Sequence, residues 1–237
     1  MEDGKKSKME DLKIIYEDNH IIVVEKKPNI PSQGDKTGDK DMLSIIKEYL
    51  IKRYNKKGDA YLGLIHRLDR PVGGVMVFAK TSKAASRLSE QVRDKTFKKT
   101  YLAIVDGKLE KDKDILENYM LKNERTNTSK IVSEGTKNAK YAKLDYEVLT
   151  YNSEIDLSVL KINLHTGRHH QIRVQMANIG HSLCGDQKYG TRGRGKQIGL
   201  WAYSLTIKHP ITKEEMTFTS IPEKIGSWKI IDGIKLV

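Results

Sequence analysis

The sequence predicts an α+β domain with a mixed, largely antiparallel sheet and flanking helices. Short apolar runs bounded by turn residues, which are typical of strands, outnumber the stretches with helical spacing. Most of these runs follow one another directly, which favours hairpins over the strand–helix–strand order of a doubly wound parallel sheet. The sequence has no internal repeat and no heptad run.

The first third of the chain predicts a strand pair followed by two helices. Apolar runs at 13–16 and 20–25 predict an antiparallel pair. Apolar residues recur at helical spacing over 42–54, behind Asp41 as a candidate N-cap. A second helix is expected from Thr81 or Ser82 to about Val92.

The remaining chain predicts mainly strands and one further helix. The helix opens at Thr166-Gly167-Arg168 and stops at Gly180. The strands and hairpins are expected at 97–105, within 108–140, at 141–149 paired with 155–164, and at 198–208 paired with 215–219.

Composition and charge limit the classes of function that the chain can have. The 237 residues carry a formal net charge of +12, which indicates a polyanionic partner, nucleic acid before an anionic membrane. The competing interpretation is a merely soluble basic protein, because Lys-Lys pairs are frequent. Cys184 is the single cysteine, so internal disulfides and multi-cysteine zinc sites are excluded. We expect a polar tail at 1–12, no signal peptide or membrane span, and a cytoplasmic protein.

The stretch 62–80 organises the candidate site. Apolar runs at 62–65 and 75–79 predict two strands with a charged turn between them. In that turn Asp69 lies between Arg67 and Arg70, whose guanidinium groups favour its ionised form. An ionised aspartate on a rigid loop can bind a metal, orient a base or attack an electrophile.

Other chemistries find less support in the sequence. His165, His169 and His170 are close together, but no acidic residue accompanies them and adjacent arginines repel a cation, so no metal is predicted. Neither a Gly-x-Ser-x-Gly elbow nor a phosphate-binding Gly-x-x-x-x-Gly-Lys-Ser/Thr loop is present. The glycine-rich segment 190–196 is interpreted as a basic contact to nucleic acid or as a plain solvated loop; its cations are Arg192, Arg194 and Lys196.

Four ordered motifs resemble those of the RluA-type RNA pseudouridine synthases. They are His-Arg-Leu-Asp at 66–69, Lys-x-Tyr-x-Ala-x-Val-x-Gly at 99–107, Thr-Gly-Arg-x-His-Gln-Ile-Arg at 166–173, and Gly-His-x-x-x-Gly-Asp at 180–186. The third motif departs from the pattern with His169 in place of a threonine, and the loop after His181 lacks the common proline. The resemblance runs from about Lys13 to the C-terminus, so one catalytic domain is expected at 13–237. No amino-terminal domain of the S4 type is expected.

The resemblance implies an isomerase that works on a uridine within RNA. Such enzymes break the bond between base and ribose and rejoin the base through its carbon 5. By position, Asp69 is expected to be the catalytic aspartate, Tyr101 to pack on the flipped base, and Arg173 to pair with Asp69. Arg67 is expected to enter the RNA beside the vacated base position.

The resemblance also sets the expected surface and partners. We expect a central RNA-binding cleft, ribosomal or transfer RNA as the substrate, no cofactor, no obligate protein partner and a monomer. Whether Asp69 attacks or only abstracts a proton stays open, and so does the alternative of a non-catalytic RNA-binding or RNA-folding protein on the same fold. A metal-dependent nuclease or phosphatase is disfavoured by the missing carboxylate cluster. Besides Arg67, Arg192, Arg194 and Lys196, the residues expected to contact RNA are His66, Arg70, Arg168, His170 and Gln171.

Overall fold

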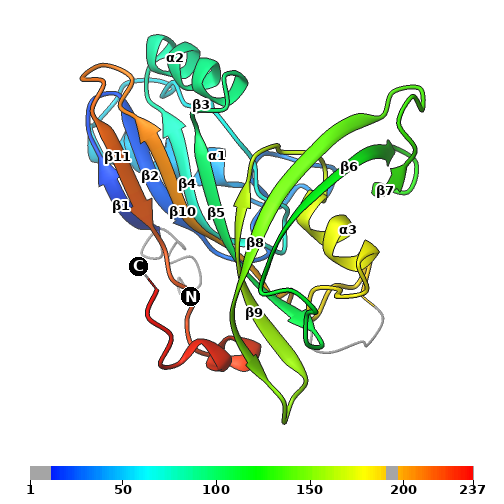
Figure 1. The fold of residues 1–237 in the computed structure, drawn as a ribbon. Coiled ribbons are helices and arrows are strands. Elements are labelled where there is room, and N and C mark those ends of the chain that lie inside the picture. Colours follow the sequence, from blue (N-terminus) through cyan, green and yellow to red (C-terminus); the bar gives the residue numbers. More distant parts are fainter. Residues whose placement is uncertain (1–11, 191–196, 237) are drawn as a thin grey trace. The chain divides into compact units, whose positions relative to one another are not determined.

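The structure, a computed structural model, describes residues 12–190 and 197–236. It is an α+β protein with mostly antiparallel strands and few helices, so the predicted fold class is confirmed (Figure 1). The chain forms two compact units. Unit 1 comprises residues 1–97 and 207–218, and unit 2 comprises residues 98–206 and 219–237. No helix of the described residues is long and apolar enough to cross a membrane.

Unit 1 is a small antiparallel sheet with two helices. Strand β2 lies between β1 and β4, and the short β3 pairs with the end of β4. The bounds are β1 Lys13–Glu17, β2 Ile21–Lys26, α1 Met42–Arg53, β3 Gly63–Leu64, β4 Gly73–Ala79 and α2 Ser82–Arg93. Both central strands are almost entirely buried, which explains why their sequences are continuous apolar runs rather than alternating ones.

Capping side chains start both helices of unit 1, as the sequence predicts. The carboxylate of Asp41 accepts the Ser44 N–H at 3.2 Å, and the hydroxyl of Thr81 accepts the Ala84 N–H at 3.2 Å. Each bond satisfies one amide that has no partner within its own helix. Apolar side chains then bury one face of each helix: Met42, Ile46 and Leu50 in α1, and Ala84 and Leu88 in α2.

Unit 2 is a larger antiparallel sheet in the order β10-β5-β9-β8-β6-β7. Its elements are β5 Lys98–Asp106, β6 Lys113–Asn123, β7 Thr128–Val132, β8 Lys140–Asn152, β9 Leu157–Leu164, α3 Gln171–Asn178, β10 Leu200–Lys208 and the 3-10 helix η1 Gly226–Ile231. Strand β10 ends within unit 1 and forms the predicted hairpin with β11 Glu215–Thr219, closed by a bond from the His209 N–H to the Glu214 carbonyl.

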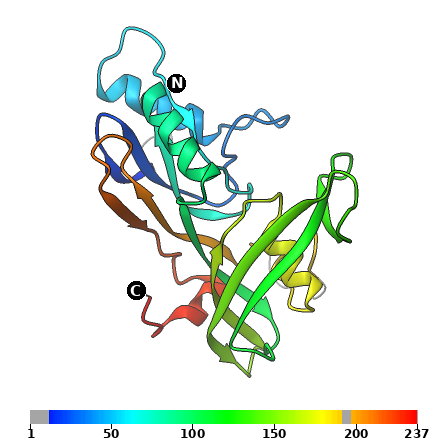
Figure 2. The ribbon, with the colours of Figure 1, turned by 45° about the horizontal axis from the view of Figure 1, so that its top comes forward.

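The two faces of the unit 2 sheet are covered by different elements. On one face Leu102 and Ile104 pack with Trp201 and with Trp228 of η1. On the other face α3 lies against β6 and β7, where Val174 packs on Met120 and Ala142 (Figures 1 and 2). Side chains alternate along β5, so residues next to Leu102 point to the face that α3 covers.

The predicted third helix begins later than expected. We predicted that Thr166-Gly167-Arg168 opens it, but α3 begins at Gln171 and His170 before it has a left-handed backbone with φ 55°. The side chain of Gln171 accepts hydrogen bonds from the Thr166 hydroxyl and from the Arg168 N–H, which fold 166–170 into a loop instead of a helical turn. The predicted stop is confirmed, since Gly180 has φ +84° after the last turn.

We predict that Asp41→Ala lowers the free energy of unfolding by about 1 kcal/mol, because the first turn of α1 loses its cap. Asp41 is buried and also accepts from the Ser44 hydroxyl, so the loss should exceed that of an exposed carboxylate such as Asp59→Ala. Denaturant titration of both variants measures this, and equal stability of Asp41→Ala and the unchanged protein would contradict it.

Candidate active site

Asp69 lies in the loop 65–72 between β3 and β4, and backbone bonds hold this loop on both sides of it. The Leu68 N–H donates to the Ser32 hydroxyl at 3.1 Å, and that hydroxyl donates back to the Leu68 carbonyl at 2.8 Å. The Val72 N–H donates to the Asp69 carbonyl at 2.9 Å, which closes a turn. Asp69 itself is partly buried, so part of this residue is exposed on a loop that hydrogen bonds anchor on both sides.

A fully buried lysine ties this loop to the segment after β2. The ammonium of Lys26 donates to three backbone carbonyls, those of Ile30 at 2.6 Å, Arg70 at 3.0 Å and Lys27 at 3.2 Å. Burial lowers the pKa of Lys26 to about 7, although the charge of Asp69 favours the protonated form. The Lys26 side chain therefore fixes the position of the residue after Asp69, and in its protonated form it adds a positive field close to the Asp69 carboxylate.

The three basic residues around Asp69 occupy different environments. Arg67 is exposed and has no hydrogen-bond or ion-pair partner among residues 12–190 and 197–236. His66 accepts the Val77 N–H through Nε2 at 3.2 Å, and its ring packs edge-on against Phe97. Of these two, Arg67 is the side chain that can reach RNA without breaking an interaction inside the protein.

Arg70 is paired with carboxylates of a neighbouring loop rather than with solvent. Its guanidinium forms an ion pair with Asp39, lies 3.9 Å from Asp35, and donates to the Thr37 hydroxyl at 3.1 Å. The pair holds the pKa of the Asp39 carboxyl below its usual value. The predicted contact of Arg70 with RNA stays a prediction, and it would compete with these bonds.

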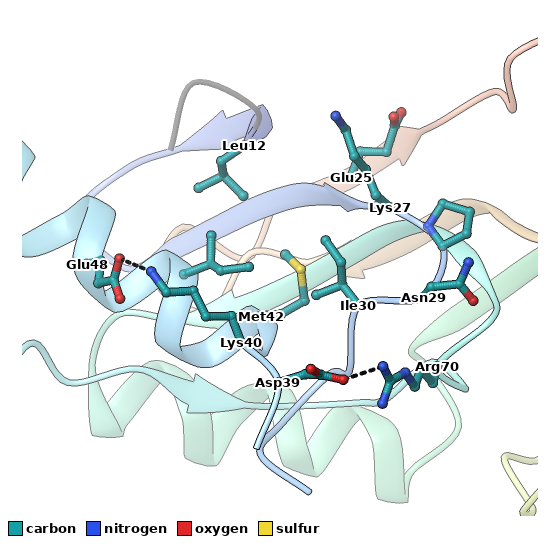
Figure 3. Close-up of a pocket in the computed structure, with 12 residues that line it drawn as sticks. Leu12, Glu25, Lys27, Asn29, Ile30, Asp39, Lys40, Met42, Glu48 and Arg70 are labelled. Carbon is teal, nitrogen blue, oxygen red and sulfur yellow. Dashed lines mark hydrogen bonds and ion pairs between the residues drawn. The ribbon is translucent and has the colours of Figure 1, made fainter. Parts of the chain in front are cut away.

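A pocket of about 430 Å³ lies beside Arg70 within unit 1 (Figure 3). Its apolar lining comes from Leu12, Ile30, Met42 and other side chains of α1 and the 27–30 segment, and its rim carries three cations and three carboxylates. Four of these charged groups form two ion pairs that are drawn in Figure 3, Asp39 with Arg70 and Lys40 with Glu48 at 2.8 Å. Because the charges balance, the pocket adds no net attraction for a polyanion.

Tyr101 is a buried residue of β5 in unit 2, opposite Ile162 of β9 and Ala202 of β10. It lies on the face that α3 covers, because its neighbour Leu102 belongs to the core on the other face. A ring fixed between two strands is a suitable flat wall for a base.

The loop before α3 is fixed by the side chain of Gln171. Its amide nitrogen donates to the Lys143 carbonyl at 3.1 Å and to Gln175, and its amide oxygen accepts from Thr166 and Arg168. Gln171 is buried and its hydrogen-bonding capacity is filled within the protein. Its position favours a supporting role, whereas the contact with RNA that we predicted stays a prediction.

Arg173 of α3 forms a buried two-bond ion pair with Asp186. Its Nε donates at 2.8 Å and its Nη2 at 2.7 Å to the two carboxylate oxygens, and both side chains are almost fully buried. Burial alone would raise the pKa of Asp186, but the Arg173 guanidinium and the N–H groups of Lys188 and Tyr189 hold that pKa below its usual value. The pair orients the guanidinium on the face that carries Tyr101.

The two histidines that precede α3 connect it to β7. The ring of His170 stacks on that of His169 with centroids 3.7 Å apart, and its Nδ1 lies 2.8 Å from the Tyr189 hydroxyl. His169 Nδ1 lies 2.9 Å from the Ser129 hydroxyl of β7. His170 is buried, so its expected contact with RNA stays a prediction while its observed contacts are structural.

The structure thus places the predicted residues in two groups. Asp69, Arg67, His66 and Arg70 share the loop of unit 1, whereas Tyr101, Arg168, His170, Gln171 and Arg173 belong to one face of unit 2. The pairing of Asp69 with Arg173 joins residues of different units and stays a prediction. Arg192, Arg194 and Lys196 lie outside the described residues. Within the described ranges, no group of three or more His, Cys, Asp or Glu side chains is arranged to hold a metal ion.

Sequence reasoning missed two residues that support the site. Lys26 precedes Lys27 and Pro28 in the sequence, and no local pattern indicates that its ammonium is buried and bonded to the Asp69 loop. Asp186 ends the fourth motif but received no role. The isolated carboxylate after Gly185 was the available signal, because the arginines and histidines before α3 required a negative partner.

Comparison with known proteins shows the family to which the chain belongs. The family model described as RNA pseudouridylate synthase matches residues 20–178. RNA pseudouridine synthase YhcT of Bacillus subtilis is 34% identical over 86% of this chain, and ribosomal large subunit pseudouridine synthase D of Nitrosomonas europaea is 33% identical over 91% of it. The chain spans 66% and 64% of the lengths of these two relatives, respectively.

A solved structure shows the same fold. The human RNA pseudouridylate synthase domain containing 1 superposes with a TM-score of 0.73 over 93% of this chain and 87% of its own, at 23% identity. The chain belongs to the RNA pseudouridylate synthase family. The prediction of that family from the four motifs, and with it of an RNA pseudouridine synthase, is confirmed.

The depressed pKa of Lys26 predicts a specific pH dependence of stability. Between about pH 7 and the ordinary lysine pKa, the unfolded chain binds a proton that the folded protein does not bind, so stability rises with pH. Relative to Lys26→Met, the free energy of unfolding of the unchanged protein should increase by about 1 kcal/mol per pH unit between pH 7.5 and 9.5. Denaturant titrations at several pH values measure it. The exposed Lys83→Met should show no such trend, and a flat difference for Lys26→Met would contradict the prediction.

Removal of Asp186 should leave the Arg173 guanidinium buried without its carboxylate. We predict that Asp186→Ala lowers the free energy of unfolding by about 3 kcal/mol, the usual effect of breaking one partner of a buried pair. Asp232→Ala, which breaks the exposed pair with Lys224 in the same unit, should change stability little. Thermal and denaturant unfolding compare the two variants. Equal losses of stability in the two variants would show that burial does not make the Arg173–Asp186 pair more important for stability than the exposed pair.

Proposed function

We propose that this protein converts uridine to pseudouridine in ribosomal RNA, with Asp69 as its catalytic carboxylate. The observation that carries the proposal is the anchored loop of unit 1, in which backbone bonds and a buried ammonium fix a partly exposed aspartate. The name of the relative in Nitrosomonas europaea, a ribosomal large subunit pseudouridine synthase, supports ribosomal RNA over transfer RNA as the substrate.

A uridine within folded RNA must leave the helix before a side chain can reach its sugar or base. Flipping costs roughly a few kcal/mol of lost stacking and pairing. The exposed Arg67, two residues before Asp69, has no internal partner among the described residues and is suited to enter the RNA in place of the base. Tyr101 supplies the flat wall for the flipped uracil.

The chemical step needs a charged carboxylate and no cofactor. Asp69 either attacks the nucleoside or removes a proton from it, after which the base separates from C1′ and rejoins it through carbon 5. The carbon 5 proton is lost and N1 gains one, so the product is an isomer of the substrate. In this proposal Arg173, oriented by Asp186, pairs with Asp69 and keeps it ionised while the base excludes water.

We further propose that both units act as one catalytic domain spanning residues 13–237, in the cytoplasm and without an obligate protein partner. The family match supports a domain that draws on both units, because residues 20–178 include the Asp69 loop of unit 1 and the Tyr101 strand and α3 of unit 2. Mass measurement of the purified protein in solution tests the expected monomer.

A pseudouridine map of ribosomal RNA tests the function. In cells that lack the gene, one or a few sites should lose pseudouridine; the intact gene and the exposed-carboxylate control Asp59→Ala should restore them. Asp69→Ala should not, because loss of a catalytic carboxylate reduces the rate by at least about a thousandfold. Restoration by Asp69→Ala would refute the catalytic role. Unchanged ribosomal sites with RNA still bound by the purified protein would favour the non-catalytic RNA-binding protein.

A further inference from the structure

Lys99 is a partly buried cation beside a second cation in unit 2. Its ammonium approaches the loop before α3 so closely that a Cβ added at Gly167 would lie 3.2 Å from Nζ. Within residues 12–190 and 197–236, the ammonium of Lys99 has no hydrogen-bond or ion-pair partner, while its backbone belongs to β5. Burial lowers the pKa of Lys99, and the positive charge of Arg168 lowers it further.

The protein holds Arg168 in place next to Lys99. The Arg168 N–H donates to Gln171, and its Nε donates to the Tyr141 carbonyl at 2.7 Å. Both bonds are to uncharged groups, so the guanidinium charge has no carboxylate partner among the described residues. Two neighbouring cations without an anion are unfavourable for folding, which indicates that a ligand supplies the missing negative charge.

The carboxylates of the neighbouring strands β8 and β6 belong to the other face of the sheet, because Asp145 pairs with Asn163, which pairs with Thr100, and Glu117 pairs with Lys143. Asp145 accepts from Asn163 at 2.8 Å and lies 2.6 Å from the ring of His165. Glu117 bonds to Tyr141 and to Lys143. The N–H of Gly167 has no acceptor in the described part of the chain either. An ammonium, a guanidinium and a backbone N–H together match the oxygens of a phosphate group.

The position of this cluster relates it to the base-binding tyrosine. Lys99 and Tyr101 are two residues apart on β5, so their side chains point to the same face and stand about 7 Å apart. This spacing places the cluster beside any base that stacks on Tyr101. Lys161 of β9, by contrast, pairs with Leu102 and therefore points to the opposite face.

We propose that Lys99, Arg168 and the N–H of Gly167 form a binding site for one RNA backbone phosphate next to the base on Tyr101. The proposal rests on the proposed function for its ligand, RNA, but not for the particular RNA or for the role of Asp69. Lys99 is then a binding residue, and Gly167 is required because a side chain there would occupy the space next to the ammonium.

The salt dependence of binding to an oligouridylate tests the site. Each lost phosphate contact reduces the slope of log affinity against log salt by about 0.7 for a single strand. Lys99→Gln should reduce the slope by about that amount, whereas Lys161→Gln, which removes the same charge from the other face, should keep the original slope. An unchanged slope for Lys99→Gln, equal slopes for both variants, or no salt-dependent binding by the unchanged protein would overturn the proposal.

A second variant and a measurement of thermal unfolding distinguish loss of the phosphate site from loss of folding. Gly167→Ala keeps every charge but places a methyl group against Nζ, so it should weaken oligouridylate binding as well. Lys99→Gln should unfold at a temperature no lower than the unchanged protein, because it removes a desolvated cation beside Arg168. The pseudouridine map of cells that lack the gene tests the proposed function separately from these binding measurements. If ribosomal sites lose pseudouridine in those cells but Lys99→Gln leaves the salt slope unchanged, only the phosphate site is refuted. If Lys99→Gln reduces the slope but no ribosomal site loses pseudouridine, only the proposed function is refuted.

Discussion

The buried pair of Arg173 and Asp186 is the interaction on which the candidate site of unit 2 depends. Each charge is removed from water, and the two short bonds between them offset much of that cost. The same carboxylate accepts the N–H groups of Lys188 and Tyr189, so the loop after α3 folds around it. Tyr189 in turn bonds to His170 and to the Ser129 N–H of β7. One ion pair therefore connects the helix, the loop after it and the β6–β7 hairpin.

Unit 1 also contains a buried charged group, the ammonium of Lys26, but this group is bonded to backbone carbonyls. Within the described part of the chain, no carboxylate is hydrogen-bonded to the buried ammonium of Lys26, and three backbone carbonyls accept its N–H groups. Carbonyls from the 27–30 segment and from Arg70 converge on that one group, so the loop of Asp69 cannot move without exposing or stranding it. Burial of a charge is expensive, and here it fixes the backbone beside the proposed catalytic carboxylate.

The cations of the described residues differ in whether a carboxylate neutralises them. Arg70, Lys40 and Lys80 are paired with carboxylates, so they contribute little to the attraction of a polyanion. Arg67 and Lys99 have no such partners among the described residues, and both lie within two residues of a side chain that the proposed reaction requires. Net charge alone predicted a polyanion, whereas the ion pairs of the structure show which of these cations are already neutralised by carboxylates.

The sequence by itself determined the strands, the helix caps and the family. Apolar runs bounded by turn residues predicted the hairpins, and Asp41, Thr81 and Gly180 predicted helix ends, because such patterns depend on interactions within a few residues. Four ordered motifs predicted an RNA pseudouridine synthase. Tertiary structure decided what local patterns do not encode: that α3 begins only after Gln171 has folded the preceding loop, that Lys26 is buried, and that Arg173 pairs with Asp186. The bonds of Lys26 to Arg70 and of Gln171 to Lys143 join groups far apart in sequence, whose burial and charge are defined only once the chain has folded.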